Sequence, residues 1–173
     1  CEVRSLRAID RNALDATDRT SHDLFLHGLD DELLFQPLVG WRRMTLGSQV
    51  GFHLEFTSLL QASPTGTAAQ AEQVLARLAA YPLRVEQELA RLREGQALGW
   101  VAARPVLERV LASLDPQIGA PVDKSPFFEP FTRLGGDIPA AEQAALQARA
   151  RTLVATQVVP AQQRLRDFVA GPY

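Results

Sequence analysis

Apolar side chains recur at spacings of three and four residues through most of this chain, which is the pattern of helices that bury one face. The stripe formed by Ala71, Val74, Leu75 and Leu78 is the clearest example. No segment shows the apolar–polar alternation that a half-buried strand requires. The sequence therefore predicts an all-α fold, built as an irregular antiparallel assembly of helices.

Capping and helix-breaking residues set the expected boundaries of these helices. Thr67, with Gln70 three residues later, predicts a capping box, and Asp15 with Asp18 resembles one. We expect Pro82 to open a new helix, because proline suits a first turn and not a helix interior. The expected helices cover residues 2–11, 16–35, 67–81, 83–98, 105–114 and 139–169.

Two further prolines bear on the C-terminal half of the chain. Asp115-Pro116 is expected to end the helix that precedes it. Pro160 lies inside the long C-terminal helix and is expected to kink it, because proline removes a backbone donor.

Residues 38–66 and 116–137 contain several glycines and prolines, which interrupt helices. Both segments are therefore predicted to be loops, and both are candidates to line a cleft. The first loop has room for a short helix near residues 54–60. The second carries three phenylalanines, and such a cluster more often ties a loop to the core than it binds a ligand. These are Phe127, Phe128 and Phe131.

The size and charge of the chain limit its partners. We interpret residues 1–173 as a single helical segment that belongs to a larger helical domain. Eighteen basic and twenty acidic side chains give a net charge of -2, which argues against nucleic acid or an anionic membrane as a partner. No stretch reaches the roughly 18 apolar residues of a membrane-spanning helix. The expected partners are the remainder of the same polypeptide or a second copy of the chain.

Cys1 is the only cysteine, so neither an intramolecular disulfide nor a thiolate metal cluster is expected. A leading cysteine also resembles the lipid-bearing first residue of a mature bacterial lipoprotein. However, Val3, Leu6 and Ile9 follow at helical spacing without a flexible tether. We therefore favour a start inside a longer gene product over a lipid anchor, and the cellular location stays open.

Three histidines are the first candidates for metal or acid–base chemistry. His22 and His27 lie five residues apart, about 140° around a helix, so they cannot coordinate the same metal ion. We therefore expect both to be solvated or hydrogen-bonded. His53-Leu54-Glu55 is similar to the His-x-Glu of zinc deaminases, but the Pro-Cys-x-x-Cys partner of that motif is missing. The sequence therefore assigns no catalytic, cofactor-binding or metal-binding residue to these positions.

The charged side chains are expected to serve solubility. Arg77, Arg84 and Arg91 recur every seven residues, but acidic residues lie about a turn away. An ion-paired, solvated face is therefore a better interpretation than an anion-binding stripe. The acidic pairs are also expected on polar faces: Asp30 with Asp31, and Glu86 with Glu88.

The order of several fragments resembles the bacterial domain-of-unknown-function family 885. The fragments that carry the resemblance are Asp10-Arg11, residues 15–19, Ser21, residues 23–26, Met44, Gly47, Gln49, residues 71–78, Tyr81-Pro82, residues 93–95, Gly99, residues 105–110, residues 125–127 and residues 159–165. Two departures are His22, where the family commonly has tyrosine, and Gln73-Val74, which lacks the usual aromatic residue. The resemblance covers nearly the whole chain in the family's order.

This resemblance implies a longer, predominantly helical parent that is similar to zinc carboxypeptidases of the gluzincin type. The family's zinc motif, a His-Glu followed by a nearby His, lies after the segment present here, so zinc is expected there and no cofactor is expected within residues 1–173. In that chemistry a zinc-bound water attacks a carbonyl group. Many family members are exported or lipid-anchored.

Three hypotheses follow from the sequence. In the leading one, the chain is the non-catalytic amino-terminal helical part of a zinc-dependent peptidase or hydrolase and forms a wall or lid of the cleft for a peptide-like substrate. The alternative is a stand-alone helical protein-interaction module. A third, a compact enzyme, needs two of His22, His27 and His53 within a few ångströms of each other. An extended exposed apolar surface would favour the first hypothesis over the second.

Overall fold

The computed structural model describes residues 2–35, 40, 42–171 and 173. Cys1 and residues 38, 39 and 41 of the first predicted loop lie outside these residues. The chain divides into two compact units, Cys1–Trp41 and Arg42–Tyr173, and each is described by itself. The predicted all-α fold is confirmed, because the described residues contain helices and one isolated bridge, Leu46 with Gly51, but no strand.

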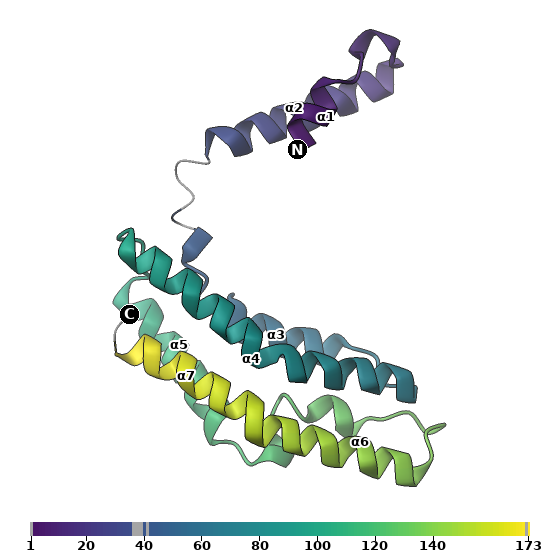
Figure 1. Cartoon of the computed structure of the whole chain (residues 1–173), viewed down its shortest axis with the longest axis vertical. Helices are drawn as coiled ribbons and strands as arrows, with labels where there is room; N and C mark the ends of the chain where they lie inside the picture. The colour runs from purple at the N-terminus through teal and green to yellow at the C-terminus, as the bar shows by residue number, and fades with distance from the viewer. Residues whose placement is uncertain (1, 36–39, 41, 172) are drawn as a thin grey trace. The chain divides into compact units, whose positions relative to one another are not determined.

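The first unit is a helical hairpin. It consists of α1 (Glu2–Arg7), the 3-10 turn η1 (Arg11–Ala13) and α2 (Ala16–Leu34), with α1 packed against α2 (Figure 1). The predicted cap at Asp15 is confirmed, because its carboxylate accepts the backbone N–H of Asp18 at 2.9 Å. An ion pair between Arg7 and Asp30 links the two helices.

The second unit is built around one long helix, α4 (Ala68–Ala97). The segment of α6 (Ala140–Leu153), the π turn η5 (Val154–Val158) and α7 (Val159–Ala170) forms one rod beside α4 (Figure 1). α7 also packs against α5 (Arg104–Gly119).

The second unit also contains three short elements between the longer helices. α3 (Phe52–Ala62) is the helix expected in the first loop, and it is longer than predicted. The 3-10 turns η3 (Val122–Lys124) and η4 (Glu129–Thr132) lie in the second loop. The capping box of Thr67 and Gln70 is present in full at the start of α4.

The prediction that Pro82 opens a new helix is wrong, because α4 runs through it without a break. The apolar stripe continues across the proline through Leu78, Tyr81 and Val85, all of which are fully buried. Burial of this continuous stripe outweighs the missing hydrogen bond of the proline.

The helix end predicted at Asp115-Pro116 is also wrong, because α5 continues to Gly119. The last turn of α5 is held by α7: Arg166 pairs with Asp115 at 3.0 Å, and Gln162 donates to Gln117 at 2.9 Å. In the C-terminal rod, the π turn η5 directly precedes α7, in whose first turn Pro160 lies. The kink expected at Pro160 stays a prediction.

The core of the second unit is centred on Tyr81. Its ring contacts the rings of Phe52, Phe56 and Phe127, with centroids 5.7, 4.6 and 5.3 Å away. The interpretation of the three loop phenylalanines as a plug is confirmed, because all three are buried. Burial raises the pKa of the Tyr81 phenol, and its interaction with Gln162 acts in the opposite direction.

Candidate functional site

A buried carboxylate is the most unusual group in the second unit. Glu88 lies on α4 with an exposure of 1%. Its Oε1 lies 2.7 Å from Nη2 of Arg84 in an ion pair and accepts a hydrogen bond from Nη1 of Arg91 at 3.2 Å. The expectation that Glu88 lies on a polar face is therefore wrong, whereas its neighbour Glu86 is half exposed and pairs with Arg164.

The position of Glu88 in the helix explains its burial. It continues the stripe of Tyr81 and Val85 at helical spacing, and Leu92 follows four residues later. This register is visible in the sequence and is the signal that could have predicted the burial of Glu88. The chain around Arg43 passes close to α4 at Gly95, because a Cβ on Gly95 would lie 2.8 Å from the Cβ of Arg43. The segment that precedes α3 therefore lies across this half of α4.

Glu88 lines a pocket of about 320 Å³ between this segment and α4. The other lining residues come from three places: the segment 44–51, the first turn of α3, and α4. They are Met44, Thr45, Gly47, Val50, Gly51, Phe52, Glu55, Arg84 and Arg91. The volume is at the lower end of the range for small-molecule sites.

The pocket contains buried polar atoms that lack a partner. Within the described residues, Oε2 of Glu88 and Oγ1 of Thr45 are buried without a hydrogen bond. Buried polar atoms are nearly always hydrogen-bonded, so a site with two orphaned oxygens is incomplete as it stands. An occupant with donor groups would complete it.

A tight turn shapes one wall of the pocket. Leu46 bridges to Gly51, and the N–H of Phe52 donates to the carbonyl of Thr45 at 3.3 Å. Gly51 has a φ of 142°, and a Cβ there would lie 2.8 Å from the oxygen of Thr45. Only glycine meets both conditions.

The charges around the pocket have both signs. The guanidinium of Arg84 lies 5.5 Å from the centre of the Phe52 ring, a cation–π contact that holds it at the pocket. Arg84 and Arg91 face the carboxylates of Glu55 and Glu88 across the same lining, so the formal charges cancel. The ion-paired face predicted for these arginines is confirmed, except that their shared acid is buried. Arg77 donates instead to the hydroxyl of Ser63.

His53 is buried near this pocket. It lies in the first turn of α3 with an exposure of 1%, and neither ring nitrogen has a hydrogen-bond partner within the described residues. Burial lowers its pKa, because the charged imidazolium is poorly solvated there. His53 is therefore neutral at physiological pH.

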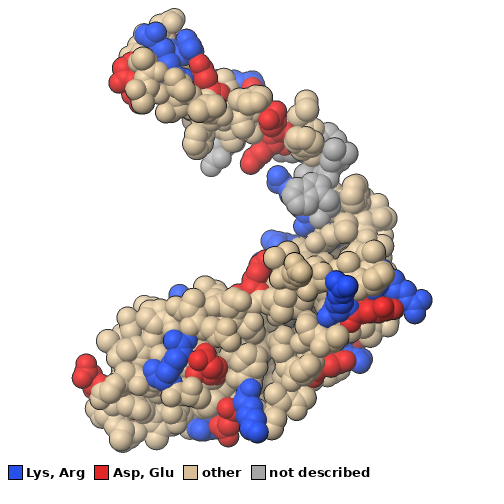
Figure 2. Space-filling view, turned by 180° about the vertical axis from the view of Figure 1, so that it is seen from behind, with Lys and Arg blue, Asp and Glu red and all other residues tan. Residues whose placement is uncertain are grey.

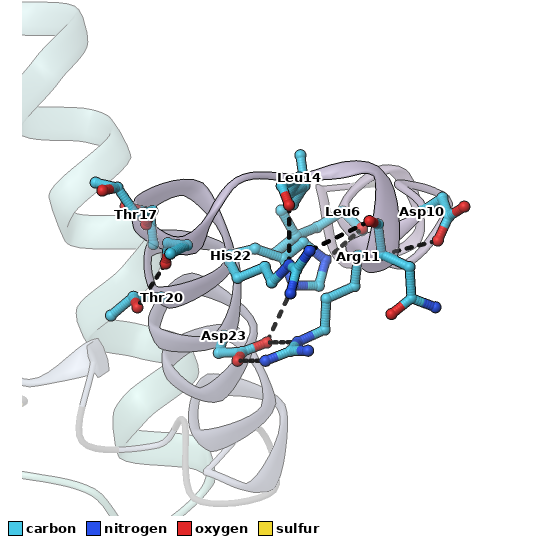
Figure 3. A network of polar contacts seen from close by, with 12 residues as sticks. Leu6, Asp10, Arg11, Leu14, Thr17, Thr20, His22 and Asp23 are labelled. Atoms are coloured by element: carbon cyan, nitrogen blue, oxygen red, sulfur yellow. Dashed lines mark hydrogen bonds and ion pairs between the residues drawn. The ribbon is translucent and has the colours of Figure 1, made fainter.

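The two histidines of the first unit bind separate groups. His22 is buried between the helices, with Nε2 3.1 Å from the carbonyl oxygen of Leu6 and Nδ1 3.4 Å from Asp23 (Figure 3). Arg11 donates to both carboxylate oxygens of Asp23, at 2.8 and 2.7 Å, and this contact lowers the pKa of Asp23 to about 2. His27 is exposed, and its Nε2 lies 3.6 Å from Asp31. The hydrogen-bonded role expected for His22 is confirmed.

The first unit leaves much apolar surface uncovered. His22 is the only described residue of α2 that is buried. Leu24 and Phe25 are 68% and 70% exposed. Three more exposed apolar side chains follow at the end of the helix: Leu33, Leu34 and Phe35.

A second hollow lies on the other face of α4. It is an open, mainly apolar groove of about 510 Å³ between α4 and α6, lined by alanines and leucines. Arg149 donates to both carboxylate oxygens of Glu72 at its edge. On the face of the second unit seen in Figure 2, blue and red side chains lie in mixed groups on a mainly uncharged surface.

In the part of the chain that the structure describes, no group of three or more His, Cys, Asp or Glu side chains could hold a metal ion. Among the same residues, no helix combines the length and apolar character that crossing a bilayer requires.

Comparison with known proteins identifies a family. The profile of the family described as "Bacterial protein of unknown function (DUF885)" matches residues 2–173. This confirms the resemblance seen in the sequence. A comparison with curated proteins gave no match, and a comparison with solved structures gave none either.

Proposed function

Because the chain belongs to the bacterial family DUF885, we propose that it is the non-catalytic amino-terminal helical part of a zinc-dependent peptidase or hydrolase. In this proposal the zinc ligands are supplied by a part of the polypeptide after this segment. The helices described here form a wall or lid of the substrate cleft.

The observation that carries the proposal is the uncovered apolar surface of α2. A hairpin that buries one side chain of α2 and exposes Leu24, Phe25 and Leu34 needs a further surface to cover it. A wall within a larger helical protein supplies such a surface. The stand-alone interaction module, in contrast, is expected to bury its own helical stripes and to keep one groove for its partner.

The pocket around Glu88 supports the role as a cleft wall. Arg84 and Arg91 can hold a carboxylate of a substrate through paired N–H groups, and they cannot activate a water for attack. The chemistry that these two arginines add to the pocket is therefore positioning, which agrees with a supporting part of an enzyme.

The test compares this chain with the longer gene product that includes its downstream coding sequence. Both are supplied with zinc and a peptide library, and cleavage is followed by mass spectrometry. We expect cleavage by the longer protein and none by the chain alone. Cleavage by the chain that persists after rigorous purification would refute the proposal, as would a stop codon directly after Tyr173.

A further inference from the structure

We propose that the pocket around Glu88 is a binding site for a small zwitterion of the α-amino-acid type. The inference concerns the second unit alone and holds whether or not the peptidase proposal is correct. It starts from the incomplete hydrogen bonding of the pocket.

The ammonium group of the ligand is assigned to the carboxylate of Glu88. Oε1 of Glu88 is already paired with both arginines, whereas Oε2 is buried and has no donor within the described residues. An ammonium has three donors and a charge that complements the carboxylate. The orphaned hydroxyl of Thr45 can accept a further donor from the same group.

The carboxylate of the ligand is assigned to the two guanidinium groups. Each guanidinium has five N–H donors, and one nitrogen of each is engaged by Glu88. Both side chains line the pocket and are 41% and 48% exposed, so the pairing with Glu88 encloses neither guanidinium. Two arginines that converge from positions 84 and 91 offer the fork that a carboxylate accepts.

The balance of charge selects a zwitterion over a simple ion. Glu55 and Glu88 would repel an anion that fills the pocket, and Arg84 and Arg91 would repel a cation. A ligand that carries both charges a few ångströms apart meets the opposite charge at each end. The apolar wall of Met44, Val50 and Phe52 then favours an apolar side chain on the ligand.

The experiment titrates the purified chain with three matched probes by calorimetry. These are L-leucine, 4-methylpentanoate, which lacks the amine, and 3-methylbutylamine, which lacks the carboxylate. We expect L-leucine to bind and each single-charge analogue to bind at least about tenfold more weakly. Equal binding of either analogue, or no binding of L-leucine, would overturn the proposal.

Variants locate the binding to this pocket. Arg91→Gln removes one guanidinium at a half-exposed position and should weaken L-leucine binding about tenfold or more. Glu88→Gln should also weaken L-leucine binding about tenfold or more, because it removes the negative charge that faces the ammonium group of the ligand. Glu86→Gln makes the identical change at the exposed pair with Arg164 and should bind as the unmodified chain does. Circular dichroism checks that each variant is folded, and L-leucine binding that Arg91→Gln leaves unchanged would refute the assignment.

Discussion

Replacement of Pro82 by alanine tests whether α4 is one continuous helix. In a regular helix, residue 82 would donate its N–H to the carbonyl of Leu78, and proline cannot make this bond. Pro82→Ala restores the donor and removes the clash of the ring with the preceding turn. The variant should therefore be more stable than the unmodified chain.

The magnitude follows from the surroundings of Pro82. Proline in a helix interior is about 3 kcal/mol less favourable than alanine. The ring is half buried, so the loss of two methylene groups offsets roughly 0.8 kcal/mol of this gain. The net stabilisation is about 2 kcal/mol, which corresponds to a rise of roughly 4–8 °C in the melting temperature for a chain of this size.

The assay is thermal and urea denaturation followed by far-ultraviolet circular dichroism, with Pro105→Ala as the matched control. Pro105 lies in the first turn of α5, where a proline N–H would be unbonded in any case, so its replacement should be neutral or slightly destabilising. If Pro82→Ala behaved like Pro105→Ala, the helix would begin at Pro82, and the continuous α4 described above would be refuted.

Four further substitutions test other parts of the structure. Gly135→Ala should destabilise the chain by about 1–3 kcal/mol, because its Cβ would lie 2.0 Å from the carbonyl oxygen of Gly66. Gly136→Ala is the control: a Cβ at Gly136 meets open space, so this variant should be nearly neutral in the same denaturation assay. Thr67→Ala should cost about 1 kcal/mol through loss of the capping box, and an unchanged urea midpoint would contradict this. Because burial lowers the pKa of His53, the unfolded chain binds the proton more readily, so the free energy of unfolding should fall as the pH drops below about 6.5. His53→Gln should show a weaker fall between about pH 7 and pH 5, and an identical fall would show that His53 does not contribute.

The helical fold could be predicted from the sequence because burial follows local periodicity in most of this chain. The stripe from Ala71 to Leu78 and the cap at Thr67 are local signals, and both agree with the structure. The errors at Pro82 and Pro116 have one cause. A local rule for proline cannot include the tertiary contacts, such as those of Tyr81 and Gln162, that hold a helix together across it.

The candidate site was harder to predict because it depends on a segment distant in sequence. Glu88 has the helical register of a core residue, but its charge suggested the surface. What buries the carboxylate is the segment 44–51 together with the two arginines, and no spacing within α4 reveals that segment. The cluster of Phe127, Phe128 and Phe131 was predictable, because three large aromatic side chains in one loop have few alternatives to burial.

We propose that this chain supports a metal-dependent enzyme without binding the metal itself. The most direct measurement is a calorimetric titration of the purified, metal-free chain with zinc near neutral pH. We expect no stoichiometric binding of zinc. One zinc ion held per chain, with an affinity that falls when His53 or another of its own histidines is replaced, would contradict it.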